Sequence, residues 1–565
     1  MQVERIDDVP LICSELKILE LSRLITEHFP VHGNWQGSSI GDLSCVFLTY
    51  ILSESDHRLS HVEDWFMSLQ HVLRYSLGSP NLVRLDCTDD RLESLLDYMS
   101  DDSCYRVFEK ALNQQIISVY QLEDELSVIH LDATIAQSYR EPNGSFSMGY
   151  AKQRHASLPQ IKVMLGTLSP LGMPLCVEVV NGSSSDDVLY LPMVDRVATT
   201  LEKKGLLFVG DSKLGSMGNR CVIAQKGHYY LTPLNRVQLP FDTLQKMVSP
   251  EALAAASEKL IYLGENKAIK AFEQSKNREY EGYEWQERLI IAFSPTYAKT
   301  QIAQLDKQIN QTKQAIQALT EIKQGKTPIQ NEQELQQKIK ELLHKSKTTA
   351  FFDIKIQTTT HETIVRKYGN RPEQMRLKYT FEVTIDLNLA TIKAHKETLG
   401  WRVYATNAPF AALNTAKVIE TYKEEYKVEY CFDQLHNKIA ALMPIFLHKE
   451  NRITALIRLL MIAIKVHSII QFKAREALRK TQTQVNELFP GNPGRKTDLP
   501  TTELILRAFM NISLVFIVLS EGNIHIEVTK LSNSQKQLLL LLNIDPRIYE
   551  DLPLFLKSNF KINET

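Results

Sequence analysis

The sequence predicts a mixed α/β protein with a layered core, an insertion within that core, and helical regions at both ends. Between residues 126 and 212, short apolar runs of β-prone residues alternate with turn residues, and a helix-periodic stretch precedes the last run. Strands followed by a helix and a further strand are typical of layered α/β structure. A helix-forming repeat at 299–347 separates this part from another strand and helix after residue 400.

Residues 1–122 predict a helical, acidic N-terminal domain. Residues 1–125 contain 9 Lys and Arg against 22 Asp and Glu, a balance of −13, whereas the rest of the 565-residue chain has 56 against 44, a balance of +12. Phosphate contacts come from Lys and Arg, so a polyanion is expected to meet the later part of the chain. A basic excess of this size permits nucleic-acid binding but does not require it.

The first part of the predicted α/β core spans residues 123–235. Asp187–Lys204 has helical spacing, and Lys162 is expected to extend along a sheet edge with its ammonium group in water. Four apolar runs predict strands, LSVIHLDAT (126–134), IKVMLGTL (161–168), PLCVEVV (174–180) and LLFVGDS (206–212).

An insertion is predicted at 236–399. Ile and Leu recur at coiled-coil-like intervals in 299–347, and Gly325 and Pro328 break the run, which predicts an antiparallel helical hairpin. The pieces 351–359 and 379–387 beside it are β-prone. Alternating Lys and Glu on the hairpin favour an exposed pairing surface over a polybasic DNA contact.

The core is predicted to resume at 400–480, with a strand at 401–407 and one long helix from about Asn414 to Leu442. Residues 481–565 predict a helical C-terminal region. Two strongly apolar stretches, Ile453–Phe472 and Ala508–Leu519, are interpreted as buried core helices. The first contains Arg and Lys and the second is too short to span a bilayer, so no membrane partner is expected.

The seven cysteines are scattered without a CxxC pair, which argues against a zinc module and a disulfide framework. The N-terminus lacks a basic stretch followed by an apolar core, as a secretion signal would have. Both features favour a reducing cytoplasm.

Two aspartates lie where a carboxylate needs a partner. Asp132 falls inside the apolar run His130–Thr134, and an isolated charge buried there is very costly unless it is paired, solvated or bound to a metal. Asp211 closes the apolar run Leu206–Gly210, at the strand end where α/β sheets usually bind ligands. Taken alone, such an aspartate is more often a turn residue or a helix cap than a ligand.

Glu429 lies on the predicted helix that begins near Asn414. Tyr422, Tyr426 and His436 are 7 and 3 positions before it and 7 after, so they share its face, and Glu425 is on the same side. A lone glutamate on a helix is usually solvated, so its joint context with the two aspartates is what singles it out.

Three carboxylates on a sheet and a facing helix suit Mg²⁺, with Mn²⁺ as a substitute, because both ions prefer oxygen ligands. Two such ions about 3.5–4 Å apart can activate a water or a 3′-hydroxyl and stabilise the leaving oxygen at a phosphodiester. Asp132, Asp211 and Glu429 are therefore candidate metal ligands and catalytic residues.

In order and spacing, four segments resemble the DDE transposases of bacterial insertion sequences. Asp132 and Asp211 are 79 positions apart and Glu429 follows after 218, which leaves room for the insertion. The segments are HLDAT (130–134), MGYAKQRHASLPQIKVMLGTLSPLGMPLCVEVVNGSSSDD (148–187), FVGDSKLGS (208–216), and the stretch 406–456 with a Tyr-x2-Arg-x3-Glu-x6-Lys-like pattern.

The resemblance implies a ribonuclease H-like core with a large insertion before the catalytic glutamate. It implies an enzyme that binds the terminal inverted repeats of its own element, cleaves a phosphodiester at each end with Mg²⁺, and joins the 3′-ends to target DNA. Synapsis of two ends implies a homodimer in the complex with double-stranded DNA. The expected location is the cytoplasm, with action at the bacterial nucleoid.

The sequence departs from the family pattern at two positions, because Glu425 stands where the family has Arg and His436 where it has Lys. The DNA contacts of those positions therefore do not carry over, and an acid at 425 would repel a nearby phosphate. The remaining candidate DNA contacts are Lys152, Arg154, His155, Lys213, Tyr422, Lys427 and Lys438.

Two alternatives stay open. The chain is an inactive or domesticated relative that binds DNA without cutting it, as Glu425 and His436 favour, or it is a coiled-coil interaction protein in which the acids are structural. The second alternative predicts no binding of divalent metal.

Overall fold

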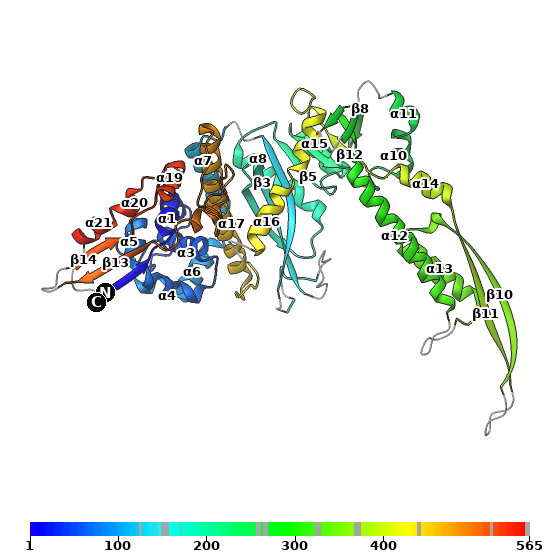
Figure 1. Cartoon of the computed structure of the whole chain (residues 1–565), viewed down its shortest axis with the longest axis horizontal. Coiled ribbons are helices and arrows are strands. Elements are labelled where there is room, and N and C mark those ends of the chain that lie inside the picture. The colour runs from blue at the N-terminus through cyan, green and yellow to red at the C-terminus, as the bar shows by residue number, and fades with distance from the viewer. Residues whose placement is uncertain are drawn as a thin grey trace.

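The structure is a computed structural model, and it describes residues 1–123, 127–138, 141–142, 144–148, 158–169, 171–255, 261–263, 269–321, 329–365, 374–437, 442–519 and 524–559. The molecule is elongated, with a helical body at one end, a large sheet in the middle and an arm at the other end (Figure 1). The mixed α/β class is confirmed, with one large mixed sheet and many helices.

The predicted helical character of the first 120 residues is confirmed. A short strand, β1 (Gln2–Arg5), precedes seven helices. These are α1 (Val9–Ile18), α2 (Leu21–His28), α3 (Ile40–Glu54), α4 (Val62–Ser68), α5 (Gln70–Leu77), α6 (Asp89–Met99) and α7 (Asp102–Tyr120).

The two ends of the chain join in one small sheet of order β1-β13-β14, formed with β13 (Ser513–Val518) and β14 (Ile524–Val528). The interpretation of Ala508–Leu519 as a core helix is therefore wrong. Burial alternates along β13, with Leu514 and Phe516 buried, and this period of two belongs to a strand. Helices α18 (Thr502–Arg507), α19 (Asn533–Leu541), α20 (Arg547–Glu550) and α21 (Leu552–Asn559) complete the C-terminal region.

The central sheet has the strand order β4-β3-β2-β5-β6-β12-β9-β8-β7. Strands β2 to β4 are antiparallel neighbours, β5 runs parallel to both β2 and β6, and the remaining pairs are antiparallel. The five predicted core strands all occur. They are β2, β3, β4, β5 and β12. The whole sheet consists of β2 (Val128–Gln137), β3 (Gln160–Ser169), β4 (Met173–Asn181), β5 (Leu207–Gly210), β6 (Tyr229–Pro233), β7 (Ile261–Leu263), β8 (Ile269–Tyr280), β9 (Tyr283–Phe293) and β12 (Trp401–Thr406).

Helices cover both faces of this sheet. On one face, α8 (Tyr190–Leu201) packs on β3 and β4, and α9 (Met217–Gln225) packs on β6, β8 and β9. On the other face, α15 (Thr415–Lys423) packs on β6 and β8, and α16 (Tyr426–Asn437) packs on β2, β3 and β4.

The prediction of one continuous helix from Asn414 to Leu442 is wrong, because the chain breaks between α15 and α16 at Glu424–Glu425. There the amides of Lys427 and Val428 bond to carbonyls only three residues back, at 2.9 and 3.1 Å. The Glu424 carboxylate accepts a hydrogen bond from the Ser169 hydroxyl at 2.8 Å, which ties the break to the end of β3.

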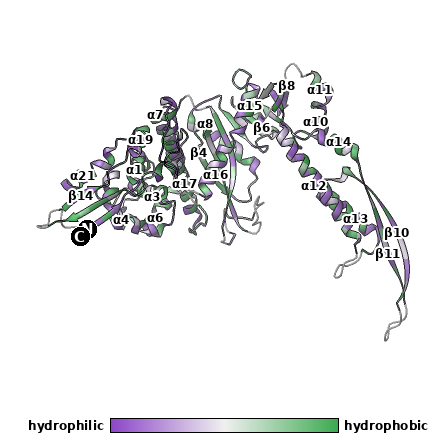
Figure 2. Ribbon diagram, viewed as in Figure 1, coloured by the Kyte–Doolittle hydropathy of each residue, from purple (hydrophilic) through white to green (hydrophobic). Residues whose placement is uncertain are grey.

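The arm confirms the predicted helical hairpin, formed by α12 (Pro295–Thr320) and α13 (Glu332–Lys345). It packs against a two-stranded ribbon of β10 (Phe352–Val365) and β11 (Gln374–Leu387), and the four elements share an apolar core of their own. Hydrophobic and hydrophilic residues alternate along both helices (Figure 2). Helices α10 (Phe241–Met247), α11 (Pro250–Ala255) and α14 (Leu389–Glu397) join the arm to the sheet.

Helix α17 (Glu450–Thr481) is long and apolar enough to cross a membrane, but 94% of its most apolar window is buried inside the fold. It packs against α3 and α6 of the helical body and against β4 of the sheet. The interpretation of Ile453–Phe472 as a buried core helix is therefore confirmed.

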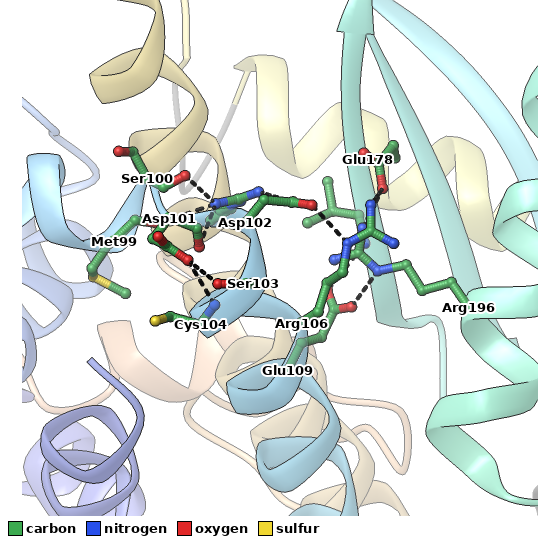
Figure 3. Close-up of polar contacts among 12 residues, drawn as sticks. Met99, Ser100, Asp101, Asp102, Ser103, Cys104, Arg106, Glu109, Glu178 and Arg196 are labelled. Atoms are coloured by element: carbon green, nitrogen blue, oxygen red, sulfur yellow. Dashed lines mark hydrogen bonds and ion pairs between the residues drawn. The ribbon is translucent and has the colours of Figure 1, made fainter. Parts of the chain in front are cut away.

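A polar cluster joins the helical body to the sheet (Figure 3). Arg196 on α8 donates to the Glu109 carboxylate on α7 at 2.8 Å, and the two side chains are only 6% and 2% exposed. Arg196 also pairs with Glu178 on β4. Because the Arg196 and Glu109 charges are buried, each depends on the other to offset the cost of its removal from water.

We expect Arg196→Met to lower the free energy of unfolding by about 3–5 kcal/mol, because it leaves the buried Glu109 carboxylate unpaired. Arg106→Met is the matched control in the same cluster, since the Arg106 side chain is 50% exposed and its removal should change stability by less than about 1 kcal/mol. Thermal unfolding of both variants checks this, and equal shifts would contradict it.

Candidate active site

Asp132 and Asp211 are neighbours on adjacent parallel strands. The register of β2 and β5 pairs Ile129 with Phe208 and Leu131 with Gly210, so each aspartate lies one residue beyond the last pair. Adjacent strands are about 4.8 Å apart, so the two aspartates start from neighbouring backbone positions.

Both aspartates belong to the sheet face that α15 and α16 cover. On β2, Leu131 packs toward α8, while Thr134 reaches α16 through a 3.2 Å hydrogen bond with His436 Nε2, so Asp132 shares the face of Thr134. On β5, the Val209 side chain lies in the same apolar cluster as Tyr422 of α15. Side chains two residues apart along a strand point to the same face, so Asp211 shares the face of Val209.

Asp211 is held by four hydrogen bonds. Its Oδ1 accepts the Tyr190 hydroxyl at 2.7 Å and the Lys213 amide at 2.8 Å, and its carbonyl oxygen accepts the Thr232 hydroxyl at 2.8 Å and the Leu214 amide at 3.1 Å. The Tyr190 ring reaches this position because residue 210 is glycine: a Cβ there would lie 3.1 Å from the ring. Burial, and then the Asp211 and Asp132 charges, hold the pKa of Tyr190 well above its usual value, so it stays a donor.

A cavity of about 460 Å³ opens beside Asp132, lined by Thr134, Phe432 and three charged residues. Asp186 accepts a hydrogen bond from Lys162 Nζ at 2.6 Å, and Lys213 Nζ lies 3.7 Å from the same carboxylate. The expectation that Lys162 extends into water is wrong, because its side chain is 13% exposed and ends on Asp186. Lys213, a predicted DNA contact, remains 46% exposed at this cavity.

Glu429 is exposed on α16 and lines a second cavity, of about 370 Å³, together with Glu425, Tyr422 and Arg402. Glu425 is less exposed than Glu429. Burial, and then the charges of Asp211 and Glu429, raise the pKa of Glu425. Glu425 therefore adds a carboxylate to the region between Asp211 and Glu429.

The other residues of the family-like pattern, Tyr422 and His436, and the nearby Lys427 are buried or paired. Tyr422 is 9% exposed and packs against Tyr404, with ring centroids 4.9 Å apart. Lys427 Nζ lies 3.1 Å from Glu424 and 3.2 Å from the Ser169 hydroxyl. Burial lowers the pKa of His436, which bonds to Thr134 and so links α16 to β2.

Four predicted DNA contacts, Lys152, Arg154, His155 and Lys438, lie outside the described residues.

The two aspartates suit a divalent cation by their chemistry and by their neighbouring positions. Within the described parts of the chain, no group of three or more His, Cys, Asp or Glu side chains is gathered closely enough to hold a metal ion. The structure thus brings Asp132 and Asp211 together and holds Glu429 on the facing helix, at a separate cavity.

Sequence reasoning missed Tyr190 and Asp186. Tyr190 begins a helix, and no local pattern marks it as a partner of Asp211. Asp186 had a signal, because it follows the serine run 183–185 directly after a strand, where ligand-binding side chains gather.

No protein-family model matches the chain, and no curated protein matches it. Among solved structures, the chain is similar to a piggyBac transposase in a synaptic complex with hairpin DNA, at 10% sequence identity over 79% of this chain and 85% of that chain, with a TM-score of 0.23. A likeness this distant establishes neither a shared fold nor a shared function.

His130 on β2 makes the stability of the folded chain depend on pH. It is 1% exposed, and burial lowers its pKa to about 4. The unfolded chain takes up a proton below pH 6.5 and the folded chain does not, so stability falls by about 3 kcal/mol as the pH drops from 6.5 to 4.

We therefore expect His130→Met to lose about 3 kcal/mol less stability than the parent between pH 7 and pH 4. His525→Gln is the control, because this histidine is 49% exposed. Denaturant unfolding at several pH values measures the difference, and parallel curves for the parent and His130→Met would refute the assignment.

Proposed function

We propose that the chain is a metal-dependent DNA transposase with a ribonuclease H-like core, which cuts phosphodiesters and joins 3′-ends to target DNA. The observation that carries the proposal is the juxtaposition of Asp132 and Asp211 on parallel β2 and β5, beneath the helix pair that bears Glu429. The strand order β4-β3-β2-β5-β6, with three antiparallel strands and two parallel additions, supports such a core.

Asp132, Asp211 and Glu429 would hold Mg²⁺ or Mn²⁺, and the bound ions would supply activation of the attacking oxygen and stabilisation of the leaving oxygen. Tyr190 donates to Oδ1 of Asp211 and so fixes the direction of that carboxylate. Among the described residues no hydrogen bond to Asp211 Oδ2 occurs, which leaves that oxygen for a ligand. Lys213 stands at the cavity beside Asp132, where it can meet a phosphate.

The DNA partners follow from the resemblance to transposases of insertion sequences. Terminal inverted repeats and target DNA would both be bound, and pairing of two ends requires a homodimer in that complex. Of the three predicted contacts within the described residues, Lys213 is the exposed one, whereas Tyr422 and Lys427 are largely buried and would act at the walls of their cavities.

The deciding experiment is strand cleavage of the gene's own flanking DNA by the purified chain with Mg²⁺ or Mn²⁺. We expect nicking at defined ends, and Asp211→Asn and Glu429→Gln should each slow it about 10³-fold, because several kcal/mol of transition-state stabilisation are lost.

Asp195→Asn is the matched control, since Asp195 is exposed on α8 and pairs with Lys226 outside the site. Cleavage that persists in Glu429→Gln would remove Glu429 from the metal ligands. No cleavage by the parent under any metal would overturn the proposed activity.

A relative that binds DNA without cutting it is the second candidate, and Glu425 is the observation that favours it. A carboxylate beside Asp211 and Glu429 adds negative charge where a phosphate would sit.

We expect Glu425→Gln to tighten metal-free DNA binding about fivefold, because removing one charge at about 4 Å in water is worth about 1 kcal/mol. Glu420→Gln, on the exposed side of α15, is the control. Fluorescence anisotropy with labelled DNA measures both, and unchanged affinity would show that Glu425 does not face the phosphate.

A further inference from the structure

A groove of about 1290 Å³ lies beside the helix that carries Glu429. Its walls are α16, the C-terminal part of α17 and the segment 482–501, and Leu171 and Gly172 of the β3–β4 turn also line it. This volume exceeds the roughly 300–1,000 Å³ of small-molecule pockets, so the groove suits part of a polymer better than a metabolite.

The groove carries a net positive charge. Its cations are Lys427, Arg475, Arg479 and Lys496, and its acids are Glu476 and Asp498. Arg479 pairs with Glu476 at 2.7 Å, and Lys427 pairs with Glu424 at 3.1 Å. Within the described residues, neither Arg475 nor Lys496 has a carboxylate within ion-pair distance.

Arg475 is already oriented. Its Nε donates to the Pro500 carbonyl at 2.9 Å, which fixes the side chain between α17 and the segment that follows it. The side chain is partly buried, so its charge is poorly hydrated and an anion would offset that cost. A guanidinium held in this way matches a phosphate well, because it presents several donors in one plane.

The groove borders the cavity that Glu425 and Glu429 line. Tyr426, which is 60% exposed, lines both this groove and the cavity of Glu425 and Glu429. Tyr430, one turn later on α16, lines the groove as well. A positive groove with aromatic rings along it is the arrangement that binds nucleic-acid strands.

We propose that this groove binds a DNA strand by its phosphates and leads it past Tyr426 toward Glu429. The inference rests on the proposed function, and it assigns to α16, α17 and 482–501 the contacts that hold DNA next to the cleavage site. Arg475 and Lys496 are the phosphate contacts, and Tyr426 supplies a ring on which a base can stack.

The test is fluorescence anisotropy with a labelled DNA oligonucleotide in EDTA, across a salt series, so that binding is measured without cleavage. For the double variant Arg475→Gln and Lys496→Gln we expect roughly tenfold to hundredfold weaker binding at about 0.1 M salt. The slope of log affinity against log salt should fall by roughly 0.7–0.9 for each phosphate that is no longer neutralised.

The matched control is Lys110→Gln with Lys226→Gln, which removes two surface lysines of α7 and the end of α9 that line no part of the groove. Because Arg475 also braces Pro500, Lys496→Glu and Tyr426→Ala are measured as well, since both side chains are exposed. Each should weaken binding roughly fivefold or more, as a reversed charge or a missing stacking ring would.

Weaker binding in these variants with unchanged controls supports the proposal. Parent-like affinity and salt slope in all of them would overturn it, and so would failure of the parent to bind DNA at all. The cleavage assay with Asp211→Asn is a separate readout, so loss of catalysis with intact groove binding would count against the proposed function and leave the groove standing.

Discussion

The register between β2 and β5 is the constraint on which the candidate site depends. Two carboxylates at neighbouring positions of parallel strands repel each other, by about 1 kcal/mol at 4 Å in water and about 4 kcal/mol at the effective dielectric constant near a protein surface. The sheet imposes this arrangement, because Leu131 and Gly210 are paired by the backbone whatever follows them. A shift of one residue would turn Asp132 to the α8 face, so the apolar side chains that fix the register also fix the acids.

Contacts around the site then set the direction of the Asp211 carboxylate and the positions of Glu425 and Glu429. The Tyr190 hydroxyl and the Lys213 amide both bond to one oxygen of Asp211, and Gly210 leaves the space that the Tyr190 ring occupies. On the other side, the break at Glu424–Glu425 allows α15 to follow the part of the sheet near β6 while α16 crosses β2 and β3. A straight helix through 414–442 would not follow both, so the bend positions Glu425 and Glu429 relative to the strands.

What could be predicted from the sequence was local. The core strands and the helical hairpin carry strong periodic signals, and Asp132 and Asp211 stand out because acids interrupt or close apolar runs. The features that were missed depend on distant partners. The 508–519 run is a strand because β1, more than 500 residues earlier, supplies its pairing edge. Lys162 and Asp186 meet only because the β3–β4 hairpin folds back, and Tyr190 reaches Asp211 only because α8 packs back onto the sheet.

The acids of the candidate site and the cations of the groove have complementary roles in the proposed function. If the proposed function holds, the charges of Asp211, Glu425 and Glu429 would repel DNA in the absence of metal, so cations elsewhere would have to hold the polymer. The later part of the chain carries an excess of 12 positive charges, and at the arm two of its lysines are matched by acids, Lys338 with Glu334 on α13 and Lys396 of α14 with Asp306 on α12. Arg475 and Lys496 differ because they line a groove and have no such partner among the described residues, and Tyr426 lines both that groove and the cavity of Glu429. In the proposed function, one helix, α16, separates the groove cations from the candidate catalytic acids, so the same element would hold a strand and face the strand ends that carry Asp132 and Asp211.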